Sequence, residues 1–83
     1  MKKIEKQLKQ LGFYLSSKGD EKDRYLYDVR KNYSIEIHIF KNDTIEIANH
    51  YEHSRYILYR GNFIDLQWIL SHLNIEECNF KQD

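Results

Sequence analysis

At the start of the chain, apolar and polar positions alternate with the periodicity of an α-helix. Three apolar residues recur at spacings of three and four, which places them on one face of a helix; they are Ile4, Leu8 and Leu11. Gly12 follows as a typical stop signal. The pattern predicts a helix over residues 2–11, then a short strand-like stretch at 13–15 and a polar loop over 16–23.

Three later segments alternate strictly between apolar and polar side chains, as β-strands with one buried face do. They cover residues 25–30, 35–40 and 45–48, and the apolar positions are β-branched or aromatic. A fourth segment, 55–60, carries a continuous apolar run instead. We interpret it as a less regular strand with both faces covered.

The hairpin that joins the second and third of these strands has two candidate registers. A two-residue turn would set Ile39 opposite Glu46 and place a carboxylate in the core. A three-residue loop over 41–43 instead pairs Ile39 with Ile45, so that the isoleucines of both strands share one face. We predict the three-residue loop.

The preceding hairpin is less constrained. Setting Val29 opposite Ile35 would bring Asp28 against Glu36, and like charges directly opposed are unfavourable. A shift by two residues sets Val29 opposite Ile37 and replaces that contact with pairs of opposite charge. We predict this second register as a preference.

A helix is predicted over residues 63–73. Asn62 is a candidate N-cap, Asp65 lies in the first turn, and Asn74 is a candidate stop. Together these elements predict an α+β fold: a single antiparallel meander of three to four strands, with an N-terminal and a C-terminal helix packed on one face.

The last helix has more apolar surface than one sheet can cover. Its predicted core face consists of Phe63, Leu66, Ile69, Leu70 and Leu73. Ile64 and Trp68 fall on a different side. Either the first helix or the stretch 13–15 covers Trp68, or this side is a surface for a partner or a homodimer, since Trp is enriched at binding hot spots.

The outer face of the sheet raises the same question. If Tyr27 and Ile37 face the core, alternate residues face outward, and in the predicted register Leu26 lies opposite Phe40. Such residues either pack under a loop or terminus or mark an interface. The predicted partner-binding residues, from this face and the last helix, are Leu26, His38, Phe40, Tyr59, Ile64 and Trp68.

Size and charge narrow the picture. The 83 residues are expected to form one domain, 1–83. Basic and acidic residues balance at 13 each, which argues against broad binding to nucleic acid or a membrane surface. Cys78 is the only cysteine, so a disulfide framework is excluded, and no signal or spanning segment is apparent. We expect a cytoplasmic protein.

Candidate chemistry is sparse. His50 and His53 lie close together in the polar segment 49–55, which we predict as a loop, but a structural zinc site needs four ligands in a recognisable pattern. We therefore predict no metal, and the three scattered glycines predict no cofactor-binding loop. One polar set could support acid–base cleavage of RNA, with an arginine stabilising the phosphate; it comprises Glu36, His38, Glu46 and Arg55.

These observations favour a non-catalytic protein-binding module over an enzyme. Alanine occurs once and proline never, while lysine, isoleucine, asparagine and tyrosine are abundant. That usage is typical of AT-rich genomes, and it suggests a phage or mobile-element protein that acts as an accessory or inhibitor by docking on a host protein. The alternative is an RNA-binding module or a small metal-independent ribonuclease.

Overall fold

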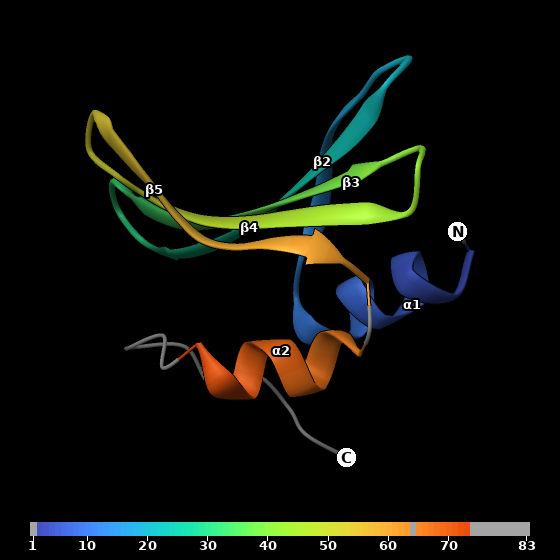
Figure 1. Ribbon diagram of the computed structural model, residues 1–83. Helices are drawn as coiled ribbons and strands as arrows, with labels where there is room; N and C mark the ends of the chain where they lie inside the picture. The colour runs from blue at the N-terminus through green and yellow to red at the C-terminus, as the bar shows by residue number, and fades with distance from the viewer. Residues whose placement is uncertain (1, 64, 74–83) are drawn as a thin grey trace.

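The computed structural model, which describes residues 2–63 and 65–73, shows one antiparallel sheet with a helix at each end (Figure 1). The antiparallel α+β prediction is confirmed, and the first helix has its predicted bounds. In chain order the elements are α1 (Lys2–Leu11), β1 (Tyr14–Lys18), β2 (Lys22–Arg30), β3 (Tyr33–Phe40), β4 (Thr44–Tyr51), β5 (Ser54–Asn62) and α2 (Leu66–His72).

The sheet has five strands rather than the three to four predicted, ordered as in the chain. The additional strand is β1, and both β1 and the start of β2 take up residues predicted as the loop 16–23. All of β1 is exposed, so this edge strand has no apolar alternation that a sequence pattern could detect. A tight turn closes the hairpin, in which the Gly19 N–H donates to the Lys22 carbonyl at 3.0 Å.

Both helices lie on the same side of the sheet (Figure 1), where their apolar faces meet its inward side chains. Burial of these side chains is the main favourable term in folding. Gly12, with a φ of 104°, turns the chain from α1 towards β1. The buried core consists of Ile4, Leu8, Leu11, Phe13, Tyr25, Ile35, Ile37, Ile39, Ile45, Ile47, Leu66, Ile69 and Leu70.

The β3–β4 hairpin has the predicted register. Ile39 pairs with Ile45, and the isoleucines further along both strands also share the core face. Asp43 adopts a φ of 66° in the loop 41–43, and its N–H donates to the Phe40 carbonyl at 3.2 Å. The predicted register is confirmed. It could be predicted because apolar residues alternate on both strands, and shifting the pairing by one residue would bury a carboxylate.

The predicted register of the β2–β3 hairpin is wrong. Tyr25 lies opposite Ile37, where the prediction had set Val29. A turn with Asn32 at a φ of 63° and a bulge near the end of β2 shorten the connection and shift the pairing. A leucine then lies opposite Glu36, so the repulsion that the prediction avoided does not arise.

The polar segment 49–55, predicted as a loop, forms the ends of β4 and β5 instead. Its turn consists of Glu52 and His53, and Glu52 has a φ of 55°. A bulge after Ile47 shifts the pairing of β5, and Tyr59 consequently lies opposite Ile47. Tyr59 packs against the core, so the prediction that it faces outward is wrong.

Helix α2 starts at Leu66 rather than at residue 63. Asn62, predicted as its N-cap, ends β5, and Asp65 caps the helix instead by accepting the Trp68 N–H at 3.2 Å. The predicted stop at Asn74 lies outside the described residues.

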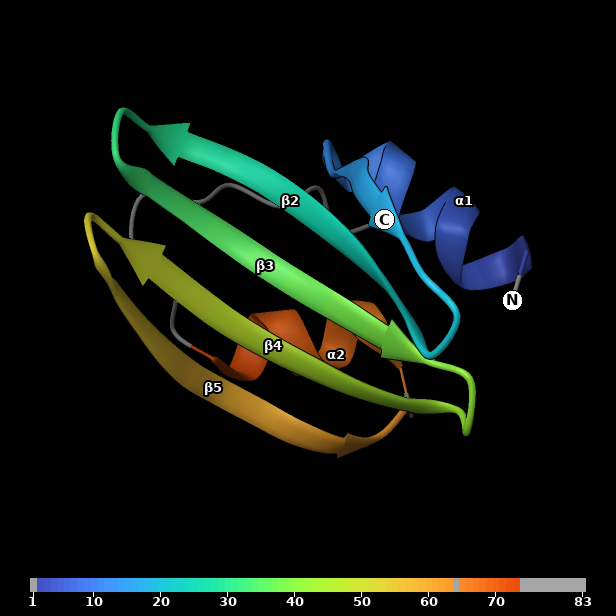
Figure 2. The ribbon, with the colours of Figure 1, turned by 90° about the horizontal axis from the view of Figure 1, so that it is seen from above.

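Neither helix covers the opposite side of the sheet (Figure 2). Figure 2 looks onto this side, with β2 to β5 in chain order and α2 behind them. We call it the open face. Its side chains, at alternate strand positions, include Tyr14, Lys22, Arg24, Leu26, Asp28, Ser34, Glu36, His38, Phe40, Thr44, Glu46, Ala48, His50, Arg55, Ile57, Arg60 and Asn62.

Candidate functional site

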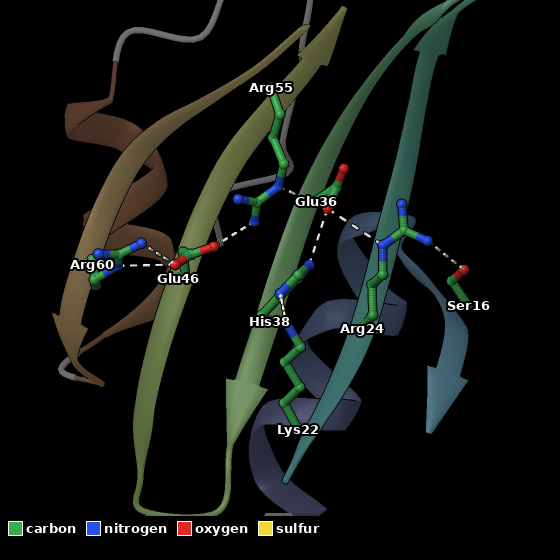
Figure 3. Close-up of polar contacts among 8 residues, drawn as sticks. All are labelled: Ser16, Lys22, Arg24, Glu36, His38, Glu46, Arg55 and Arg60. Carbon is green, nitrogen blue, oxygen red and sulfur yellow. Dashed lines mark hydrogen bonds and ion pairs between the residues drawn. The ribbon is translucent and has the colours of Figure 1, made fainter. Parts of the chain in front are cut away.

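The open face carries a cluster of charged side chains from β2, β3, β4 and β5 (Figure 3). The strand registers set four of them in one row across the sheet: Arg24, His38, Glu46 and Arg60. Directly opposed residues on one face of a sheet are in contact distance. Within this row Arg60 donates to Glu46, whereas Arg24 and His38 both donate to Glu36 in the neighbouring row.

The next row along the strands is mostly apolar. Leu26, Ala48 and Ile57 face outward in it, and Glu36 stands between Leu26 and Ala48 at the centre of the sheet. A carboxylate in such surroundings is stable only when donors surround it, because an unpaired buried charge is strongly unfavourable.

Glu36 has those donors. Only 2% of its surface is exposed. Its Oε1 accepts the Nε–H of Arg24 and that of Arg55, each at 3.3 Å. The same oxygen accepts the Nε2–H of His38 at 3.0 Å. The two arginines approach from opposite sides (Figure 3), so their long side chains shield the carboxylate from water.

Glu46 completes the network on the β5 side. It is buried, and its Oε1 accepts a hydrogen bond from Nη2 of Arg55. Its Oε2 accepts from Nε and Nη2 of Arg60 at 2.9 and 2.8 Å. Arg55 therefore bridges two buried carboxylates and ties β5 to β3 and β4.

Arginine pairing keeps both carboxyls ionised. Burial opposes ionisation of Glu36, but the hydrogen bonds from Arg24, His38 and Arg55 outweigh it and lower the pKa of this carboxyl to about 2. Burial likewise opposes ionisation of Glu46, and the hydrogen bonds from its two arginines lower its pKa. Both groups carry a full negative charge at neutral pH.

His38 is held as one neutral tautomer. Lys22 lies 3.1 Å from Nδ1 and has only protons to donate, so Nδ1 is the acceptor and Nε2 carries the proton given to Glu36. Burial lowers the pKa of His38; the hydrogen bond to Glu36 opposes this, and the charges of Lys22 and Arg55 add to it. The Lys22 ammonium also lies 5.6 Å from the ring centroid of Phe40.

The acid–base set expected from the sequence is brought together here, but its proton-transfer groups are already engaged. A general acid or base must exchange a proton near neutral pH. Glu36 has a pKa of about 2 and three donors on one oxygen. His38 is buried and bonded through both ring nitrogens. The geometry favours a fixed donor surface over acid–base chemistry.

Three predicted partner-binding residues lie on the open face: Leu26, His38 and Phe40. Leu26 and Phe40 are not opposed as predicted, since Leu26 pairs with Glu36 and Phe40 with Lys22. The row that contains His38 separates them, so the predicted contiguous apolar patch is not formed.

Trp68 lies on the helix side of the molecule. It is 55% exposed, so neither α1 nor the stretch 13–15 buries it. Its ring stacks on that of His72 with centroids 4.0 Å apart. Ile64, predicted beside it, lies outside the described residues.

Three cations of the cluster were missed at the sequence level: Lys22, Arg24 and Arg60. Lys22 and Arg24 alternate with Leu26 and share its face, but this signal is visible only once β2 is known to begin at Lys22. Strict alternation from Ile57 would place Arg60 on the helix side, but the bulge in the β4–β5 pairing brings it to the open face.

Comparison with protein-family models, with curated proteins and with solved structures finds no match to this chain. Within residues 2–63 and 65–73, no three His, Cys, Asp or Glu side chains are grouped so as to hold a metal ion. The described helices include none that is long and apolar enough to cross a membrane.

Proposed function

We propose that the chain is a small non-catalytic module that binds another protein through the open face of its sheet, as an accessory or inhibitor protein would. One observation carries this proposal. The carboxylates of the cluster are buried, whereas the side chains of Arg24, Arg55 and Arg60 remain 36%, 33% and 66% exposed. The network keeps its acceptors inside and presents donors to solvent.

Fixed donors suit binding. Each arginine is held by a buried carboxylate, so little side-chain freedom is lost when a partner docks. Ile57 lies beside them on the open face and is 46% exposed, which adds an apolar contact. Arginine next to apolar side chains is typical of interface centres.

A nucleic-acid role is the second candidate, and it rests on the grouping of Glu36, His38, Glu46 and Arg55. It predicts RNA cleavage that persists in a chelator and is lost in His38→Ala. The engaged nitrogens of His38 and the low pKa of Glu36 count against it.

Affinity capture followed by direct binding tests the docking role. A protein recovered by the wild-type chain is identified, purified and titrated against three variants. Ile57→Gln and Phe40→Ala alter the open face, and Trp68→Gln is the matched change of an exposed apolar residue on the helix side. Each is checked for folding by circular dichroism.

We expect the two open-face variants to weaken the purified complex and Trp68→Gln to leave it unchanged. Loss of binding in Trp68→Gln alone would contradict the proposal and move the docking surface to α2. If light scattering then showed that wild-type chains pair and Trp68→Gln chains do not, the Trp68 surface would be a homodimer interface.

A further inference from the structure

We propose that the docking partner presents an acidic protein segment, whose carboxylates bind Arg24 and Arg60 across the open face. This inference rests on the docking role proposed above and adds the chemistry of the partner. Arginine recognises carboxylates through N–H groups in a fixed planar fork, so unused N–H groups indicate where an acceptor would bind.

Each arginine of the cluster has such unused groups. Nε and Nη1 of Arg24 are bonded to Glu36 and Ser16, which leaves Nη2. Arg60 uses Nε and Nη2 on Glu46. In the described part of the chain, Nη2 of Arg24 and Nη1 of Arg55 and of Arg60 have no hydrogen bond. Three oriented donors therefore remain for an acceptor from outside.

The charge seen by a partner is positive. The open face has four cations, Lys22, Arg24, Arg55 and Arg60, and three carboxylates, Asp28, Glu36 and Glu46. Two of the carboxylates are buried, while the arginines are partly exposed. An anionic partner is thus favoured although the whole chain has a net charge of zero.

The separation of the outer arginines indicates the shape of that partner. Arg24 and Arg60 lie in one row on β2 and β5, three strand spacings apart. At ~4.8 Å per spacing this is about 14 Å, and four residues of an extended chain span about 13 Å. One small anion cannot reach both arginines, whereas acidic residues four apart in an extended segment can.

The same face is poorly suited to single-stranded nucleic acid. Bases bind on aromatic side chains set along a basic groove. Here the row beside the arginines on β2 to β5 consists of Leu26, Glu36, Ala48 and Ile57, and none of these side chains offers an aromatic ring for base stacking. Phe40 lies near the end of β3 with Lys22 against its ring. The observations favour carboxylates on a protein.

Peptide titration tests the inference on the full chain. The probe is an extended peptide of about nine residues with two glutamates four positions apart. The control peptide has glutamine at both of these positions. At low salt we expect the glutamate peptide to bind at least about tenfold more tightly than the glutamine peptide, and to lose affinity as salt rises.

We expect Arg24→Gln and Arg60→Gln each to lower the affinity for the glutamate peptide about fivefold. Arg30→Gln is the matched control, because Arg30 lies over the rings of Tyr33 and Tyr51 on the helix side. It should change the affinity less than about twofold. Circular dichroism verifies that all three variants fold.

Three results would overturn the acidic partner. They are equal affinity for the two peptides, no binding of the glutamate peptide at low salt, and tighter binding of a short single-stranded RNA that the same arginine changes abolish. The captured protein separates the two proposals. If Ile57→Gln weakens binding of the captured protein but Arg24→Gln and Arg60→Gln do not, docking on the open face is supported and the proposal of an acidic segment is wrong.

Discussion

Glu36 shows how a single residue organises the open face. A carboxylate at the centre of a sheet is unfavourable unless its desolvation is offset, and here Arg24, Arg55 and His38 offset it through one oxygen. The same contacts hold both guanidinium groups in place. Binding geometry and local stability therefore depend on the same side chain.

Replacement of this carboxylate should be costly. We expect Glu36→Gln to lower the free energy of unfolding at pH 7 by about 3 kcal/mol, the equivalent of a pKa shift from 4.5 to about 2. Urea unfolding measures the change. Asp28→Asn, which removes an exposed carboxylate from the same face, should have a much smaller effect.

The difference in unfolding free energy between wild type and Glu36→Gln should depend on pH. The folded pKa of Glu36 lies below its ordinary value of 4.5, so its contribution is complete above that pH and is lost as the pH falls towards about 2. Urea unfolding of wild type and Glu36→Gln at a series of pH values should show the two stabilities converging in this range. A constant difference down to pH 3 would show that the ionised carboxylate is not the source.

His38 should produce the second acid-sensitive step. Its pKa is below the ordinary 6.5 in the folded chain, so the unfolded chain binds the proton more readily. Stability should be greatest above pH 6.5 and fall as the pH drops through that value towards the folded pKa. Lys22→Gln should reduce this slope, because it removes a charge that opposes protonation of His38. An unchanged slope in urea unfolding would contradict the assignment.

At the scale of single residues, the sequence predicted which side chains are polar and outward but not which of them touch. Glu36, His38, Glu46 and Arg55 were grouped correctly from strand alternation. The pKa of His38 is lowered first by its burial and then by the charges of Lys22 and Arg55, and these contacts become visible only in the structure. Strand alternation does not reveal that Glu36, His38 and Glu46 are buried on the side of the sheet that faces away from the helices.

At the scale of elements, predictability depended on how many strands carry an apolar pattern. The β3–β4 register could be derived because isoleucines alternate on both strands. The β2–β3 register could not, because the bulge near Arg30 moves the pairing without a local signal. Strand β1 has no buried side and therefore no alternation.

The turn between β4 and β5 offers a test at this scale. Glu52 adopts a φ of 55°, and its N–H donates to the Asn32 carbonyl at 2.7 Å. Left-handed backbone is unfavourable for glutamate and accessible to glycine. Glu52→Gly should raise the unfolding free energy by about 0.5–1 kcal/mol in thermal or urea unfolding.

The neighbouring residue is the control for that change. His53 lies in the same turn without a positive φ, so His53→Gly should lower stability through the added freedom of the unfolded chain. If both glycine variants lower stability equally, relief of the left-handed conformation does not contribute.

The whole molecule is a two-layer structure in which both helices cover one side of the sheet (Figure 1). Apolar burial on the helix side stabilises the fold, which frees the other side for an ionic network that a core would exclude. The division of the chain into helices and alternating strands was predictable from apolar periodicity. The use of the open face was not, because it depends on contacts among four strands. The AT-rich, mobile-element origin stays a prediction.

Side-chain NMR of the chain with its purified captured partner tests whether the open face is the docking surface. The methyl groups of Leu26, Ala48 and Ile57 report on the open face, and the indole N–H of Trp68 reports on the helix side. We expect the three methyl signals to shift on binding while the indole signal stays in place. Shifts of the indole signal with unchanged methyl signals would contradict docking on the open face.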